Sequence, residues 1–170
     1  VCSSDLILAG HPVVTPLAQK AWEIARSQIG VKEQPLGSNA GPQVNAYLAS
    51  VGLGPGYFWC AAFVYWCYQQ AAQQMKVTNP MLKSASSSDI FAWAKQAGRV
   101  VTRPQHGDIF VVRGGERTHY HTGMVDDVTD GNGRMPTIEG NSNTDGSANG
   151  IEVAHRIPGR LANTCDFIRL

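Results

Sequence analysis

The first predicted helix begins at Thr15, where apolar residues start to recur with helical spacing. Thr15 followed by Pro16 is typical of a helix start. A threonine side chain accepts hydrogen bonds from the free N–H groups of the first turn, and proline fits the first helical position. The apolar residues that follow share one helical face, which predicts a helix that ends before Gly30. They are Leu17, Ala21, Ile24, Ala25 and Ile29.

Three further helices are predicted in the first hundred residues. A proline opens a short one over residues 42–51. The next, over residues 60–75, is apolar on nearly all sides, which is typical of a buried helix. A fourth is expected to be capped by Ser88 or Asp89 and to end at residue 98.

From residue 108 onward the pattern changes to short strand-like runs separated by glycine, asparagine and aspartate turns. Helices first and neighbouring strands afterwards predict an α+β fold, in which N-terminal helices pack on a C-terminal antiparallel β-sheet. The predicted strands cover residues 109–112, 123–128, 136–139, 151–155 and 167–170.

Composition favours one enzyme-sized domain over residues 15–170. The 170 residues suffice for a single core, and the net charge of +1 with mixed charges gives no basic stripe for nucleic acid. No apolar run approaches the length of a membrane span. We therefore expect no nucleic-acid partner, no membrane insertion and a monomer.

Residues 1–14 are predicted to be a leader that is partly non-native. Read back into codons, residues 1–6 reproduce the end of a common sequencing adapter, so we expect the native start to be displaced. Cys2 is therefore left out of the cysteine count, and Cys60, Cys67 and Cys165 remain. Buried reduced thiols are favoured over a Cys67–Cys165 disulfide.

The strongest candidate for chemistry is Cys60, which opens the apolar helix directly after a glycine-rich loop. Free N–H groups and the helix dipole at such a position stabilise a thiolate and can hold an oxyanion. From this segment alone, a buried small apolar residue is the better interpretation.

A thiolate hydrolase also needs a base and a group that orients this base. His121 opens a strand-like run, and Glu139 and Asn141 end the next one. The turn at residues 130–133 predicts that these strands are neighbours, which would bring an imidazole beside a carboxylate or an amide.

Taken in order, four short motifs resemble the CHAP domain, the cysteine- and histidine-dependent amidohydrolase/peptidase branch of the NlpC/P60-like papain superfamily. The resemblance extends over residues 15–170 and implies a papain-like fold. The motifs are Trp59-Cys60-Ala61-Ala62-Phe63-Val64, Gly107-Asp108-Ile109-Phe110, His121-Thr122-Gly123-Met124-Val125 and Ile138-Glu139-Gly140-Asn141.

The resemblance implies a role for each matching residue. Cys60 would be the nucleophile, His121 the general base, and Glu139 and Asn141 the residues that orient His121. We expect Glu139 to be the direct partner and Asn141 a support, since a carboxylate stabilises imidazolium better than an amide does.

Two nearby residues are candidates for substrate binding. His119 lies two positions before His121, so a regular strand would point both side chains to the same face. The Gly-Met-Val that follows His121 selects it as the base. Trp59 could stack on substrate, or it could equally wedge the helix start into the core.

No metal and no cofactor are predicted. His119 and His121 with Cys60 lack the spacing of a zinc site. The segment from Asn141 through Asp145 to residue 152 has calcium-loop spacing but few carboxylates, so weak or no calcium binding is expected.

The function that the resemblance implies is hydrolysis of bacterial peptidoglycan at an amide bond of the stem peptide, the cross-bridge or the sugar–peptide junction. The chain would be a phage or bacterial lysin that acts at the cell wall after secretion or release. Two alternatives stay open: an amidase toxin directed at the walls of competitors, and a non-catalytic wall-binding module of the same fold.

Overall fold

The computed structural model describes residues 14–115, 119–144 and 150–170. In these residues four α-helices precede a six-stranded sheet, and a short 3-10 helix (Ala162–Thr164) comes before the last strand. The helices are α1 (Pro16–Ser27), α2 (Pro42–Ser50), α3 (Cys60–Met75) and α4 (Ser87–Gln96). The strands are β1 (Val100–Val101), β2 (Ile109–Arg113), β3 (His119–Val125), β4 (Arg134–Ser142), β5 (Glu152–Leu161) and β6 (Cys165–Ile168).

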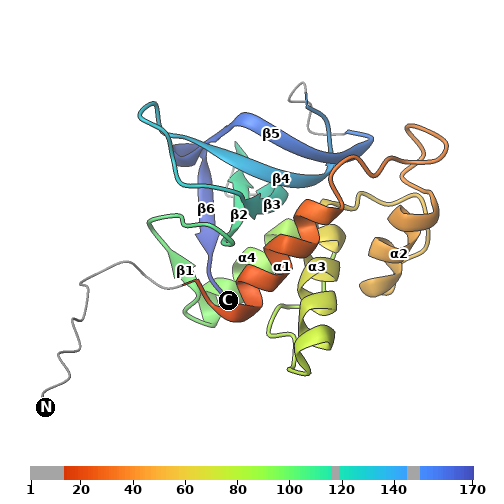
Figure 1. Ribbon diagram of the computed structural model, residues 1–170, viewed down its shortest axis with the longest axis horizontal. Coiled ribbons are helices and arrows are strands. Elements are labelled where there is room, and N and C mark those ends of the chain that lie inside the picture. Colours follow the sequence, from red (N-terminus) through yellow and green to blue (C-terminus); the bar gives the residue numbers. More distant parts are fainter. Residues whose placement is uncertain (1–13, 116–118, 145–149) are drawn as a thin grey trace, which may run out of the picture.

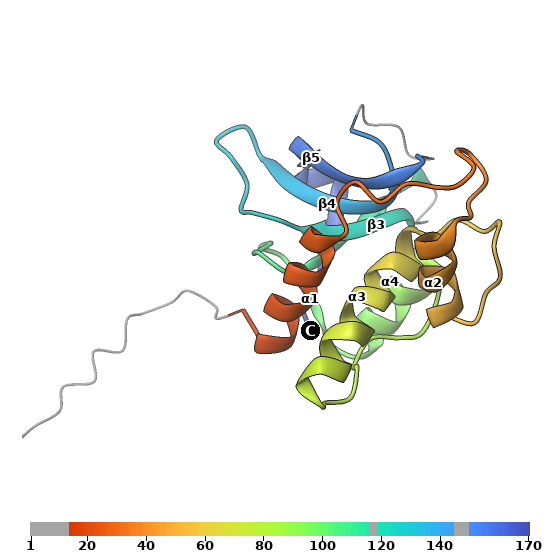
Figure 2. The same ribbon diagram turned by 45° about the vertical axis from the view of Figure 1, so that its right-hand side comes forward.

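The sheet is antiparallel throughout, with the strand order β1-β6-β2-β3-β4-β5. The helices gather on one side of it (Figures 1 and 2), where α3 packs against β3 and β4 and α4 packs against β3. This arrangement confirms the predicted α+β, papain-like architecture with N-terminal helices on a C-terminal sheet. Most of the predicted leader, residues 1–13, lies outside the described residues.

The first helix begins where the sequence predicts. Thr15 Oγ1 accepts a hydrogen bond from Ala18 N at 3.1 Å and donates one to the backbone oxygen of Leu170 at 2.7 Å. The cap thereby ties the start of α1 to the end of the described chain. Ile29 is 37% exposed, contrary to the predicted apolar face, because α1 ends at Ser27.

The cap of α4 differs from the prediction. Ser86 is the N-cap, and its hydroxyl accepts from Asp89 N at 3.2 Å. In a run of three serines any hydroxyl could serve as cap, and the choice of Ser86 makes Ser87 the first helical residue. Ser87 is consequently buried, whereas Ser88 is exposed.

Helix α3 forms the centre of the core, as its all-round apolar surface predicts. Phe63, Val64 and Cys67 are fully buried along it. The cysteines Cys60, Cys67 and Cys165 are all buried and free, so the predicted reduced state is confirmed and no Cys67–Cys165 disulfide forms.

The strand boundaries are where the sequence predictions fail most. β3 covers His119–Val125 instead of residues 123–128, so the polar residues before Gly123 belong to the strand. β6 is shifted to Cys165–Ile168, β4 and β5 are longer than expected, and the short β1 was not predicted. Polar side chains inside strands hide the alternating pattern, because here they face a buried polar site.

Candidate active site

The thiol of Cys60 sits at the first residue of α3. Trp59 is the N-cap without a side-chain cap bond, so the N–H groups of the first turn have no helical acceptors. The side chain is nearly enclosed, with 6% of the residue exposed. This position gives the sulfur both the positive end of the helix dipole and a site with little water.

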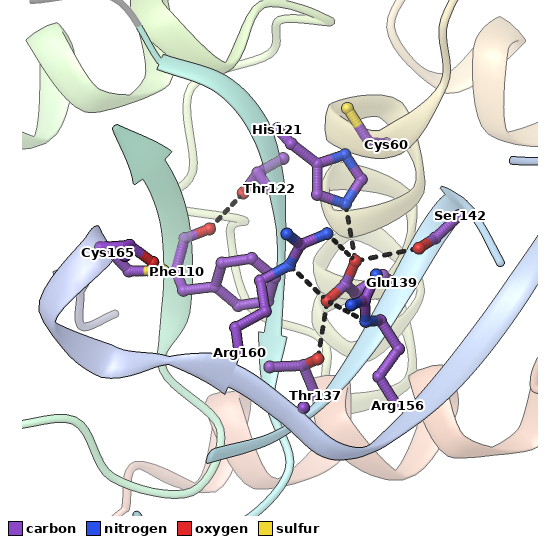
Figure 3. Close-up of polar contacts among 12 residues, drawn as sticks. Cys60, Phe110, His121, Thr122, Thr137, Glu139, Ser142, Arg156, Arg160 and Cys165 are labelled. Atoms are coloured by element: carbon purple, nitrogen blue, oxygen red, sulfur yellow. Dashed lines mark hydrogen bonds and ion pairs between the residues drawn. The ribbon is translucent and has the colours of Figure 1, made fainter. Parts of the chain in front are cut away.

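His121 comes from β3 and lies between the thiol and a carboxylate (Figure 3). Its Nε2 donates to Glu139 Oε2 at 2.8 Å, and the thiol of Cys60 lies on the other side of the ring, where it interacts electrostatically with His121. His121 and Glu139 are almost completely buried, with 1% and 0% of their side chains exposed. Residues far apart in sequence thus form a continuous Cys–His–Glu chain.

Glu139 is held by more partners than any sequence motif indicates. Arg160 donates twice, from Nε to Oε1 at 2.7 Å and from Nη2 to Oε2 at 2.6 Å. The hydroxyls of Thr137 and Ser142 donate at 2.7 and 3.0 Å, and Arg156 Nε lies 3.6 Å from Oε1. The carboxylate is therefore fixed on every side (Figure 3).

The electrostatics favour a thiolate–imidazolium pair. Burial acts to raise the pKa of Cys60, but the hydrogen bond and charge of His121 outweigh it, so this pKa is lowered. Burial acts to lower the pKa of His121, but its bonds to Cys60 and Glu139 raise it overall. Burial would also raise the pKa of Glu139, yet His121 and Arg160 hold it well below its usual range. These shifts favour alternating charges, negative on Cys60 and Glu139 and positive on His121.

Ser87 is a site residue that the sequence analysis missed. Its hydroxyl lies 4.0 Å from Cys60 Sγ, and this contact lowers the pKa of the thiol further, as does the backbone of Thr122. The three serines at residues 86–88 indicate only the start of a helix, and no feature of the neighbouring sequence indicates a contact with residue 60. Arg160 was also missed, because no feature of the sequence around it indicates a contact with Glu139.

Gly140, between Glu139 and Asn141, is required by packing. A Cβ there would lie 2.7 Å from Phe63 Cβ and 2.9 Å from Trp59 Cζ3. Since real Cβ atoms do not approach so closely, only glycine lets β4 pass against the start of α3. This close approach is what brings Glu139 within reach of the residues around Cys60.

Of the two residues expected to orient His121, only Glu139 makes the hydrogen bond. Asn141 is 2% exposed and adopts a positive φ of 52°, and its side-chain oxygen has no hydrogen-bond partner among the described residues. The supporting role of Asn141 stays a prediction. The candidate calcium loop is likewise untested, because Asp145 lies outside the described residues.

The prediction that His119 and His121 point to the same face is wrong. His121 pairs with Val112 and His119 with Arg113, and the register shift between them is a β-bulge at Tyr120. Neighbouring residues of β2 face opposite ways, so the two histidines do as well.

His119 lines a groove of about 980 Å³ beside α4, together with Ser88, Phe91 and Lys95. Its Nε2 lies 2.8 Å from Asp166 Oδ2, and its ring lies 4.1 Å from that of Phe91. Neither Cys60, His121 nor Glu139 is among the described residues that line this groove.

Trp59 is packed in the core beneath the start of α3. The indole is completely buried, stacks 5.6 Å from the Tyr47 ring and donates from Nε1 to Glu33 Oε1 at 2.9 Å. Of the two interpretations of Trp59, the structure shows the packing one. Glu33 thereby anchors the residue that precedes the thiol.

Comparison with known families agrees with this geometry. The family model of the CHAP domain matches residues 52–141, which include Cys60, His121, Glu139 and Asn141, and which make up more than half of the chain. The chain belongs to the CHAP domain family, whose members are hydrolases of the amidase or peptidase kind that act on peptidoglycan. Searches of curated proteins and of solved structures gave no match. No helix in the described ranges is long and apolar enough to cross a bilayer.

Proposed function

We propose that this chain is a cysteine-dependent peptidoglycan hydrolase that cleaves an amide bond of the stem peptide, the cross-bridge or the sugar–peptide junction. The observation that carries the proposal is the buried Cys60–His121–Glu139 chain, with the thiol at a helix start. A non-catalytic wall-binding module would have no need of a thiol with a lowered pKa next to a fixed imidazole.

In the first half-reaction, the Cys60 thiolate attacks the amide carbonyl carbon and a C–S bond forms. The protonated His121 gives its proton to the leaving nitrogen, the C–N bond breaks, and a thioester remains on Cys60. Glu139 keeps the imidazole in the orientation for this transfer and stabilises its positive form.

In the second half-reaction, His121 takes a proton from water, and the hydroxide attacks the thioester carbonyl. The C–S bond breaks, a carboxylic acid leaves, and the thiolate–imidazolium pair is restored. Two donors support the oxyanion in both steps, the backbone N–H of Cys60 and the hydroxyl of Ser87.

We propose that the groove beside α4 holds a part of the substrate away from the scissile bond, since its lining includes His119 but not Cys60 or His121. Its lining combines the rings of Phe91 and His119 with the charged groups of Lys95 and Asp166, which suits a peptide that carries both apolar and charged groups. His119 would then contact substrate without taking part in proton transfer. The site of action is proposed to be the bacterial cell wall, reached by secretion or release.

The test is digestion of purified sacculi, followed by mass spectrometry of the soluble fragments. Amide cleavage predicts fragments with a new amino group and a new carboxyl group, and intact glycosidic bonds. Cys60→Ala should lose at least about a thousandfold in rate. Cys67→Ala, a matched buried thiol in the same helix, should keep most activity. Full activity of Cys60→Ala, or cleavage of glycosidic bonds, would contradict the proposal.

A further inference from the structure

Three exposed aromatic residues flank the proposed catalytic pair. Tyr57 and Phe58 precede Cys60 by three and two positions and are 56% and 62% exposed. Tyr120 precedes His121 and is 55% exposed. The described residues include every Phe, Trp and Tyr of the chain, and among them these three alone are exposed large aromatics.

The segment that carries Tyr57 and Phe58 is held at both ends. Gly56 N donates to Asn39 O at 2.8 Å on one side, and the indole of Trp59 donates to Glu33 on the other. Because consecutive Cα atoms are about 3.8 Å apart, the Phe58 backbone lies within roughly 8 Å of that of Cys60. The two rings are therefore presented to solvent by a fixed loop beside the thiol.

Tyr120 is exposed for a different reason, the β-bulge of β3. The register passes from His121 to His119 without pairing Tyr120, so its side chain is released from the regular alternation of the strand. Tyr120 also interacts electrostatically with Arg160, the main partner of Glu139.

Exposed aromatic rings that gather at one place on a surface mark a binding site, whereas scattered aliphatic residues do not. The exposed aliphatic side chains here, such as Leu36, Val128 and Ile157, come from separate loops and strands. The three exposed aromatic residues, in contrast, all lie within three positions of Cys60 or His121 in the chain.

We infer that Tyr57, Phe58 and Tyr120 bind the apolar faces of the peptidoglycan substrate on the two sides of Cys60. These faces are the C–H faces of the sugar rings and the methyl groups of lactyl and alanine units. The tyrosine hydroxyls add polar contacts at the solvent-exposed edge of the rings. This inference rests on the proposed function and adds the residues that set substrate affinity.

The experiment measures binding separately from chemistry. In the Cys60→Ala background, binding to purified sacculi is compared for the parent, Phe58→Ala, Tyr120→Ala and the control Val128→Ala, whose residue is 57% exposed in another loop. Parallel titrations use a sugar-free stem peptide and a disaccharide-peptide fragment. They distinguish binding to the C–H faces of the sugar rings from binding to the methyl groups of the peptide. Thermal unfolding checks that each variant is folded.

Each ring variant is expected to bind sacculi about tenfold more weakly, which corresponds to partial loss of one aromatic contact, while Val128→Ala binds like the parent. In the active enzyme, the same variants should raise KM about tenfold and leave kcat within about twofold. Weaker binding to either soluble fragment supports the inference and identifies which apolar face is bound. Unchanged binding of both ring variants to sacculi and fragments overturns it, whatever Cys60→Ala does to hydrolysis.

Discussion

Replacement of Arg160 by methionine should destabilise the fold and change the pH profile together. Arg160 makes two short hydrogen bonds to a carboxylate that is completely buried, and its own side chain is only 11% exposed. Removal of one partner from such a pair leaves an uncompensated charge and costs about 3–5 kcal/mol. Glu139 keeps its bonds from Thr137, Ser142 and His121, so we expect the lower end, about 3 kcal/mol.

For a domain of this size, this free energy corresponds to a fall of about 6–12 °C in the unfolding midpoint. Differential scanning calorimetry of Arg160→Met, with Arg156→Met as the control, measures it. Arg156 lies 3.6 Å from the carboxylate, beyond hydrogen-bond distance, so its loss should cost about 1 kcal/mol or less. Equal midpoints for the two variants would refute the assignment of Arg160 as the main partner.

The catalytic effect of the same change has a definite sign. Arg160 neutralises part of the charge of Glu139, so without it the carboxylate acts more strongly on His121 and raises its pKa further. Activity falls at high pH when the imidazolium loses its proton, and this alkaline limb should move to higher pH. A purely structural role would lower activity at all pH values without moving the limb, and that result would contradict the electrostatic argument.

Three further predictions concern the neighbouring residues. His121→Ala should lose nearly all hydrolysis of sacculi, whereas His119→Ala should lose much less; equal losses would mean that the base is misassigned. Ser87→Ala should raise the pKa of Cys60 and move the acid limb of the pH–rate profile to higher pH, and an unmoved limb would remove Ser87 from the site. Activity in excess chelator should stay within about twofold of that in millimolar calcium, under roughly half a kcal/mol; a larger dependence that Asp145→Ala abolishes would identify a calcium site.

The sequence predicted those features that depend on local signals. The start of α1 at Thr15 and the buried character of α3 follow from caps and periodicity within one segment. The order of the CHAP motifs predicted that Cys60, His121 and Glu139 share one site, and the structure places the three side chains together.

What the sequence could not predict depends on tertiary contacts. The bulge at Tyr120 arises from the pairing of β3 with β2, and no feature of β3 alone reveals it. Arg160 reaches Glu139 only because β4 and β5 are neighbours. The burial of Trp59 involves Glu33, which accepts a hydrogen bond from the indole N–H and comes from another part of the chain.

The central claim is that Cys60 acts as a thiolate nucleophile activated by His121. The most direct test is alkylation with iodoacetamide at neutral pH, with the adduct located by peptide mass spectrometry and the residual hydrolysis of sacculi measured in the same samples. The account predicts that activity falls in proportion to a single adduct on Cys60, while Cys67, whose pKa burial raises well above its usual value, stays unmodified. In His121→Ala the adduct should form much more slowly at the same pH. Hydrolysis that survives complete alkylation of Cys60 would contradict the account.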